Sequence, residues 1–487
     1  MEVKPGEVVG VIKSIFIYII LSIGLLGYAQ NDSILTYKKK VLEAIEVDLL
    51  IGYYEQEGIH ASVTGGIGNE DLQNTAPTVV IRIPLNDDDV LTVDAGLSAY
   101  TSASSSNGNP FNQTGASESG YDEDNSSRGP AGGSPWIASS GASRKDILTS
   151  INLSYVHASE DRNQYWSANI GGSFEYDYES FGFGGGFTQL WNEKNTEFSI
   201  KTQVYLDQWK PIIPTEIHEF EIYGNGFLVD DRSYFYNVSV TDSEGNGVVS
   251  YLPSNFTSID DVNRNSYSVS LEFSQILSKR LQFSFFADYV MQKGWLANPL
   301  QRVYFADRPN FYIGNFRSIP YYESATNKDI FHLADDIERL PRTRIKFPFG
   351  VRLNYYLNEF IVLRSYYRKY SDDWGIDSNT VQFELPIKFN LKWKLTTSFR
   401  YYDQTATDYF APYNQHLSTQ EFYTSDYDLS AFSSRQIGGS LVYTDVFSKY
   451  KLGKLSLKMI SLRYQNYERS DGLSAFSVST GFSFVID

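Results

Sequence analysis

RNSYSVSLEFSQILSKRLQFSFFADYVMQK, residues 264–293, is the stretch that decides the fold. In its first half the odd-numbered positions from Tyr267 to Phe273 are apolar, and the even-numbered positions are serine or glutamate. After a short turn at 278–280 the alternation resumes, with Phe286 and Val290 as the two exceptions. A period of two on both arms of a short turn predicts a long antiparallel hairpin with one apolar and one polar face.

Such apolar faces either meet in a sandwich core or contact lipid. Similar alternating segments recur along the chain, and many reach the roughly 9–11 tilted residues that a strand needs to cross a bilayer. Short connections alternate with four long ones at 101–144, 208–263, 294–343 and 403–433. Counting the segments between them places every long connection on the same side, which is typical of barrels with short periplasmic turns and long outer loops.

We therefore predict an all-β fold over residues 45–487: a single transmembrane antiparallel β-barrel in the bacterial outer membrane, with about 16 strands and a range of about 14–18. Residues 56–66 are interpreted as a continuation of the first strand. Lys4 and Lys13 precede an apolar run at 14–26, which predicts a signal peptide over residues 1–29 that is cleaved after Ala29, with a single membrane anchor as the alternative. Residues 30–44 would then form a short periplasmic segment.

The composition narrows the function further. Aromatic residues make up 16% of the chain, which suits the aromatic girdles of a membrane barrel. The absence of cysteine excludes disulfides, thiolate metal sites and lipoprotein anchoring. The net charge of −17 argues against a nucleic-acid partner, which would need a basic face.

Several motifs are specific enough to suggest a family. They are YYEQEG at 53–58, VTGGIG at 63–68, AYTSAS at 99–104, SGAS at 140–143, RIKFP at 344–348, FYTSDYDLSAF at 422–432 and SDGLSA at 470–475. Over essentially the whole mature chain the sequence resembles a family of outer-membrane β-barrel proteins from Bacteroidota described only as a domain of unknown function. The resemblance implies an outer-membrane barrel and carries over no activity, ligand or catalytic residue.

The charges on the polar strand faces change sign along the chain, and these faces would line the lumen. The predicted acidic wall consists of Asp94, Glu175, Asp207, Glu272 and Asp288. The predicted basic wall consists of Lys346, Arg352, Arg364, Arg368, Lys388, Lys394 and Arg400. Opposed walls would set a transverse field across an aqueous lumen, where fixed charges act over a Debye length of about 8 Å.

Three functions are compatible with these residues. The first is a porin-like channel for small polar or charged solutes. The alternative is a plugged, non-conducting barrel that acts as a surface binding or assembly component through 101–144 and 403–433. The third, an outer-membrane hydrolase, would draw on His416, Glu421, Asp426 and Asp428, although Asx-turns explain the last two acids more simply.

We expect no enzyme activity, no cofactor and no bound metal. The acidic pairs on the long loops are interpreted as solvated surface rather than calcium sites, because none matches a defined calcium loop. The expected partners are outer-membrane lipid and lipopolysaccharide, the barrel assembly machinery and small polar solutes. Gly182–Gly186 lie in the middle of a predicted strand, where small residues would leave room for the bulk of a neighbour.

Overall fold

The computed structural model describes residues 40–102, 145–253, 255–322, 330–446 and 449–486. The chain divides at residue 40, and the description below concerns the unit that begins at Val41. The predicted signal peptide and nearly all of the 101–144 connection lie outside the described residues.

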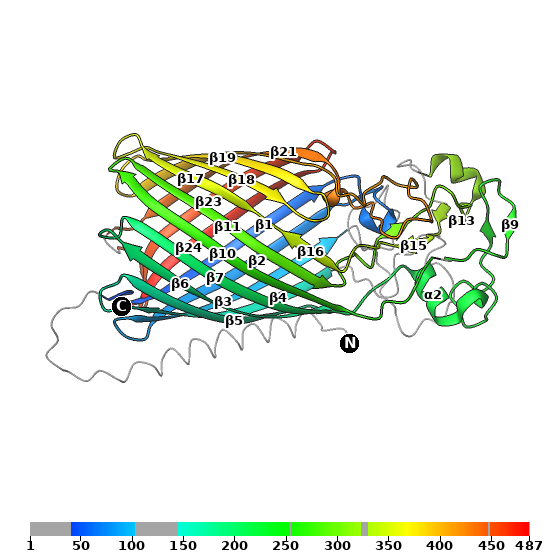
Figure 1. Ribbon diagram of the computed structural model, residues 1–487, viewed down its shortest axis with the longest axis horizontal. Coiled ribbons are helices and arrows are strands. Elements are labelled where there is room, and N and C mark those ends of the chain that lie inside the picture. Colours follow the sequence, from blue (N-terminus) through cyan, green and yellow to red (C-terminus); the bar gives the residue numbers. More distant parts are fainter. Residues whose placement is uncertain (1–39, 103–144, 254, 323–329, 447–448, 487) are drawn as a thin grey trace. The chain divides into compact units, whose positions relative to one another are not determined.

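One antiparallel sheet closes on itself, because β1 (Ile45–Glu57) pairs with β24 (Ser474–Ile486). The other long strands are β2 (Leu72–Pro84), β3 (Asp89–Ser102), β4 (Lys145–Ala158), β5 (Gln164–Phe174), β6 (Tyr178–Trp191), β7 (Thr196–Trp209), β10 (Asn263–Ser278), β11 (Leu281–Gly294), β18 (Val362–Ser371), β19 (Asp377–Lys388), β20 (Trp393–Gln404), β21 (Phe432–Thr444) and β23 (Leu455–Arg469). β16 (Thr343–Lys346) and β17 (Phe349–Tyr356) form one crossing, and β22 (Lys451–Leu452) lies within a turn. The sheet is therefore a closed barrel of 16 strands (Figure 1), and the predicted fold is confirmed.

The register of the opening hairpin shows which face is outside. Leu271 lies opposite Ala287 and Glu272 lies opposite Phe286, so each pair shares one side of the sheet. Leu271 and its side of the hairpin are exposed, whereas Phe286 is buried on the inner side. Exposed outward side chains of the same kind follow around the barrel, among them Leu153, Phe181, Phe183, Phe285, Phe383, Phe399, Ile437 and Leu462. The apolar faces therefore form an outer belt that suits contact with lipid.

The barrel has two different ends. At the first end, which we call the turn end, the strands are joined by short segments such as 159–163, 192–195 and 279–280, and β24 finishes there at Ile486. At the second, which we call the loop end, lie the connections 210–262, 295–342 and 405–431 (Figure 1). At the turn end, exposed Trp191 ends β6, exposed Trp393 begins β20 and exposed Trp166 lies two residues after the start of β5, as expected for an interfacial girdle.

Two local expectations are wrong. β1 ends at Glu57, and residues 58–71 form a connection with the 3-10 helix η1 (Ser62–Thr64) instead of continuing the strand. Gly65 and Gly66 have φ angles of 79° and 89°, a left-handed conformation that an extended strand does not contain. The alternation of apolar and polar residues also predicts one strand over 344–357, but this strand is broken at Pro348, because proline has no N–H for the ladder.

The long connections fold into a structure that we call the cap, which comprises the described residues of 58–71, 210–262, 295–342 and 405–431. Its elements are α2 (Thr215–Tyr223), η4 (Gly224–Gly226), β8 (Val240–Thr241), β9 (Gly247–Val248), β12 (Arg302–Val303), β13 (Tyr312–Gly314), η5 (Phe316–Tyr321), β14 (Ile330–His332), β15 (Asp336–Ile337), η6 (Tyr427–Leu429) and the helix η1. Three apolar clusters fill it, one around Phe227 and Phe331, a second around Ile217 and Ile337, and a small third one around Phe305. In the part of the chain described here, no helix is long and apolar enough to span a membrane.

Candidate functional site

The lumen wall is the first candidate site, and the strand register identifies its residues. Residues directly opposite one another share a side, and pairings such as Asp94 with Asn152 or Arg368 with Gly350 continue the inward face of Glu272 around the barrel. The same rule places the other strand residues of both predicted walls on the lumen side, namely Asp207, Asp288, Lys346, Arg352, Arg364, Lys388, Lys394 and Arg400. Glu175 follows β5 and accepts a hydrogen bond from Tyr100 of β3.

The two predicted walls are only partly opposed. In the order of the 16 strands, β3 with Asp94 lies eight places from β18, which carries Arg364 and Arg368. By contrast, β11 with Asp288 lies directly beside the first basic strands, and β10 with Glu272 lies one strand farther away. The lumen charges thus change sign both across the barrel and along its wall.

A mixed ionic and aromatic cluster lies where acidic and basic strands meet. Arg352 donates to Glu272 over a distance of 2.7 Å, and its guanidinium carbon lies 4.7 Å from the centre of the Phe286 ring. Phe286 stacks on Tyr366 with ring centres 5.5 Å apart. The exception to the sequence alternation at Phe286 therefore has a structural reason, because the ring supports a charged side chain on the lumen wall.

The lumen charges pair along the wall. Arg364 contacts Glu384 on the neighbouring strand at 3.5 Å, and Arg82 contacts Asp48 on the neighbouring strand at 2.6 Å. Arg352 and Glu272 lie two strands apart. The side chains of Arg352 and Arg364 nevertheless remain 45% and 53% exposed. These side chains are therefore paired along the wall and still about half accessible to solvent.

Glycines widen the same wall on the acidic side. Gly182, Gly184 and Gly186 of β6 point inward, as their pairings with β7 show. A Cβ atom at Gly182 would lie 2.7 Å from the Tyr205 ring, and one at Gly184 would clash with Gln203. The prediction that these glycines leave room for a neighbour is confirmed.

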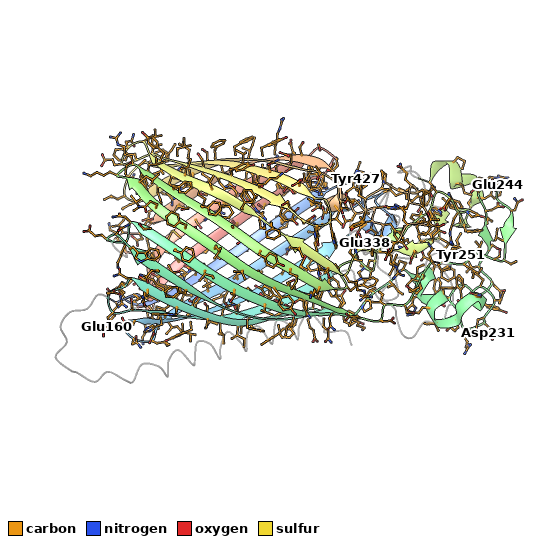
Figure 2. The ribbon with its side chains drawn as sticks, in the orientation of Figure 1. Glu160, Asp231, Glu244, Tyr251, Glu338 and Tyr427 are labelled. Carbon is orange, nitrogen blue, oxygen red and sulfur yellow. The ribbon has the colours of Figure 1, made fainter. Side chains whose placement is uncertain are left out.

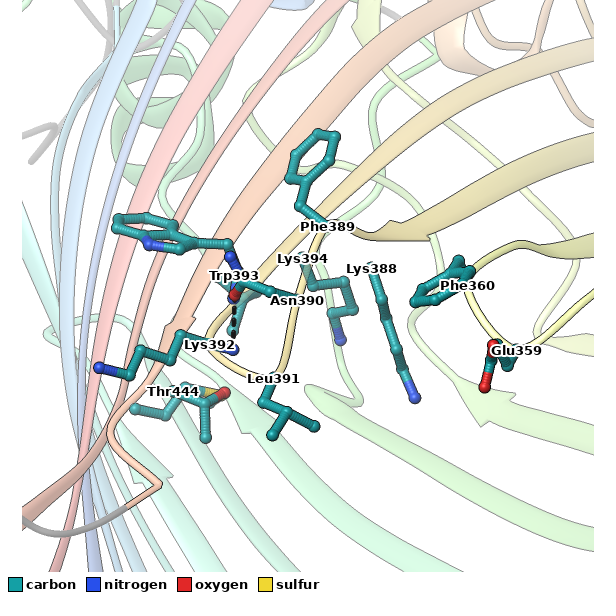
Figure 3. A pocket seen from close by; sticks show the side chains of 12 residues that line it. Glu359, Phe360, Lys388, Phe389, Asn390, Leu391, Lys392, Trp393, Lys394 and Thr444 are labelled. Atoms are coloured by element: carbon teal, nitrogen blue, oxygen red, sulfur yellow. Dashed lines mark hydrogen bonds between the residues drawn. The ribbon is translucent and has the colours of Figure 1, made fainter.

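A cavity of about 590 Å³ opens at the turn end. It is lined by Lys388, Lys392 and Lys394, with Glu359 and several apolar residues. In Figure 3 the side chains of Lys388 and Lys394 run side by side in one direction, whereas that of Phe389 points away. Sequence reasoning found Lys388 and Lys394 as wall residues and missed the cavity, because its shape depends on how two turns meet.

The cap at the loop end contains a buried ion pair. Arg302 is 1% exposed, its Nε and Nη2 atoms donate to the Glu216 carboxylate at 2.7 and 3.0 Å, and Nη1 donates to the Val63 carbonyl at 2.9 Å. One guanidinium thus joins α2, β12 and the connection after β1. Figure 2 marks Glu338 and Tyr427 near the barrel and Tyr251 and Asp231 farther into the cap.

Several cap carboxylates are also buried. Burial raises the pKa of Asp335 to about 7, although the Phe305 backbone N–H donates to it at 2.8 Å. Burial likewise raises the pKa of Glu338, and the negative charge of Asp426 raises it further. Thr424 donates to Glu338, and Tyr423 donates to Asp336 at 2.5 Å, so the connection after β20 holds this acidic segment.

The residues considered for a hydrolytic site lie in the connection 405–431. Their side chains do not converge on one another as those of a hydrolytic site would. The His416 ring bonds to the Thr424 carbonyl at 2.9 Å and to Gln420 at 3.3 Å. Asp426 accepts the backbone N–H of Asp428 at 2.9 Å, which is the predicted Asx-turn. Among the described residues, no group of three or more histidines and carboxylates is placed to hold a metal ion.

A comparison with known protein families shows which family the chain belongs to. Residues 18–471 match the model of a family described as protein of unknown function, DUF3570. The chain belongs to the DUF3570 family. This membership confirms the family resemblance seen in the sequence motifs, and the closed barrel with its apolar belt makes this DUF3570 member an outer-membrane protein.

Solved structures similar to this DUF3570 chain include a bacterial polysaccharide outer membrane secretin, with a TM-score of 0.40, 8% identity and coverage of 91% of this chain and 98% of the other. The outer membrane protein OpdK from Pseudomonas aeruginosa gives a TM-score of 0.33, 8% identity and coverage of 91% and 99%. A deletion mutant of the monoaromatic hydrocarbon channel TodX gives 0.37, 8%, and coverage of 92% and 91%. No curated protein matches the sequence.

Proposed function

We propose that the protein is an outer-membrane channel for small polar or charged solutes, with its loop end outside the cell and its turn end in the periplasm. The observation that carries the proposal is the state of the lumen charges. Arg352 and Arg364 are paired with carboxylates on nearby strands and still remain about half exposed. Side chains that filled the lumen as a structural plug would be buried against one another.

The predicted walls would determine which solutes pass. The basic wall (Lys346, Arg352, Arg364, Arg368, Lys388, Lys394 and Arg400) and the acidic wall (Asp94, Glu175, Asp207, Glu272 and Asp288) both line the same water-filled space in this proposal. Fixed charges of both signs orient polar and zwitterionic solutes and disfavour apolar ones, because an apolar solute gains nothing for the ordered water it displaces.

The test is the conductance of purified full-length protein in a planar lipid bilayer. We expect steady ohmic steps from wild-type protein or, if the cap closes the mouth, from the variant Arg302→Met, in which the cap loses its buried cation. Conductance that appears only in the variant supports a channel gated by the cap. Silence of both proteins, with the barrel intact by its heat-dependent migration on gels, would contradict the channel.

The cap favours a second candidate function, a non-conducting barrel that presents a surface binding or assembly component. A cap with three apolar clusters and a buried ion pair is more ordered than a passive connection needs to be. Lipopolysaccharide, outer-membrane lipid and the barrel assembly machinery are the partners we propose for either function. We propose no hydrolytic function, because His416 bonds to an amide and a carbonyl in its own connection.

A further inference from the structure

The cavity at the turn end holds an excess of positive charge. Some other lumen cations pair with a carboxylate, as Arg352 does with Glu272 and Arg364 does with Glu384. In the cavity three lysines face one carboxylate, that of Glu359. Among the ion pairs found in the described residues, none involves these three lysines.

The register makes this excess of positive charge costly. Lys388 lies directly opposite Lys394 in the β19–β20 ladder, where opposing Cβ atoms are about 4.5–5.5 Å apart. Like charges in this position destabilise a sheet, and Figure 3 shows the two side chains running in the same direction. Lys392 adds a third ammonium group from the turn between β19 and β20. The backbone N–H of Lys392 donates a 2.8 Å hydrogen bond to the Asn390 side chain, which stabilises this turn.

The apolar walls of the cavity restrict which molecules could bind in it. Phe360, Leu391, Val442 and Met459 contribute apolar surface beside the ammonium groups. The volume of about 590 Å³ falls within the range of roughly 300–1,000 Å³ that is usual for small-molecule sites. An occupant would need at least two negative charges for the lysines and an apolar body for these side chains.

We infer that this cavity is a binding site for small organic anions that carry two or more carboxylate or phosphate groups on an apolar body. The site deepens the proposed channel function by naming a class of solute, and it rests on that function only in needing a water-filled lumen. Lys388 and Lys394 would contact the anionic groups, Lys392 would add attraction from the rim, and Glu359 would weaken binding.

Calorimetric titration of full-length protein in detergent tests the site without requiring conduction. The probe is benzene-1,3,5-tricarboxylate, and its uncharged counterpart is benzene-1,3,5-trimethanol. We expect the tricarboxylate alone to bind, the double variant Lys388→Gln with Lys394→Gln to weaken binding about tenfold or more, and Glu359→Gln to tighten it, since charge-assisted contacts carry the recognition.

Lys279→Gln is the matched control, because Lys279 is an exposed lysine in a turn at the same end and does not line the cavity. Its affinity should stay within about twofold of wild type, since a single exposed charge contributes little. Equal weakening by Lys279→Gln, equal binding of the uncharged probe, or no binding at all would overturn the site. If the wild-type protein binds the tricarboxylate but shows no conductance, the result would instead contradict the proposed channel and support the binding site.

Discussion

The barrel wall and the cap use the same charged side chains in opposite ways. Arg352 on the wall is 45% exposed, lies over an aromatic ring and pairs with Glu272. Arg302 in the cap is 1% exposed and pairs with a carboxylate, Glu216, that is fully buried. Charges that keep their water can be exchanged at little cost in stability, whereas a buried pair costs stability as soon as one partner is lost. In the proposed channel the wall charges would select solutes, whereas the buried pair stabilises the cap.

The largest effect is expected from breaking the buried pair. Arg302→Met leaves the Glu216 carboxylate buried without its cation, and we expect the cap to lose about 3–5 kcal/mol of local stability. Hydrogen exchange followed by mass spectrometry would show faster exchange in cap peptides, with barrel peptides unchanged.

Arg232→Met is the control for this variant, because Arg232 also pairs with a carboxylate but is 70% exposed. Its exchange should stay close to wild type. Adding Glu216→Leu to Arg302→Met should restore part of the protection, since the stranded charge is removed. A cap that exchanges alike in Arg302→Met and Arg232→Met would remove the distinction between the two regions.

The second effect concerns the outer belt. Phe285→Arg places a cation on the lipid-facing side of β11, where we expect a cost of about 2–4 kcal/mol to folding into vesicles. Gln282→Arg, on the lumen side of the same strand and partly exposed, should cost much less because the cation keeps its water. Urea titrations in lipid vesicles measure both, and equal costs would mean that the two faces are misassigned.

The third effect is the pH dependence of the cap. Because the pKa of Asp335 is raised to about 7 in the folded cap, the folded state holds a proton that the unfolded chain releases near pH 4. Stability therefore falls as pH rises from about 4 through 7, by about 1.4 kcal/mol between pH 6 and 8 for this one group. Hydrogen exchange corrected for its intrinsic pH dependence should show this loss, and Asp335→Asn should reduce it. A cap that gains protection with rising pH would contradict the assignment.

The smallest expected effect concerns ion selectivity. Arg364→Glu with Arg368→Glu reverses two lumen charges, and we expect the cation-to-anion permeability ratio to rise a few-fold, because fixed charges in a narrow lumen act within a Debye length of about 8 Å. Reversal potentials across a salt gradient measure it. Lys369→Glu is the control, since Lys369 lies on the outer face beside Asp377 and should leave the ratio unchanged. Equal shifts in both variants would refute the lumen assignment.

The barrel could be predicted from the sequence because its determinants are local. The alternation along one strand is enough to predict that Leu271 faces lipid and Glu272 faces the lumen. No contact with a distant residue is needed for this prediction. Even the exception at Phe286 was visible, although its stacking partner Tyr366 lies on a different hairpin. The break at Pro348 was missed, because the alternation around it predicts one unbroken strand, although proline cannot donate in a ladder.

The cap could not be predicted in the same way, because its contacts join distant segments. Arg302 donates hydrogen bonds to Glu216 and Val63, and Tyr423 donates one to Asp336. No periodic pattern in the sequence predicts either set of contacts. The available signal was the richness of 295–342 in aromatic residues, which a solvated connection does not need. The lysine cavity was partly predictable. The sequence showed that Lys388 and Lys394 are charged residues of the lumen wall, but only the folded structure showed that they line one cavity.

The central claim is that the charged face of each strand encloses water while the other face contacts lipid, and two adjacent residues test it most directly. Because the chain contains no cysteine, Arg364→Cys and Leu363→Cys each introduce a single thiol into the barrel in membranes. A charged, membrane-impermeant methanethiosulfonate reagent should label Arg364→Cys and leave Leu363→Cys unlabelled. Labelling of Leu363→Cys with protection of Arg364→Cys would contradict the account.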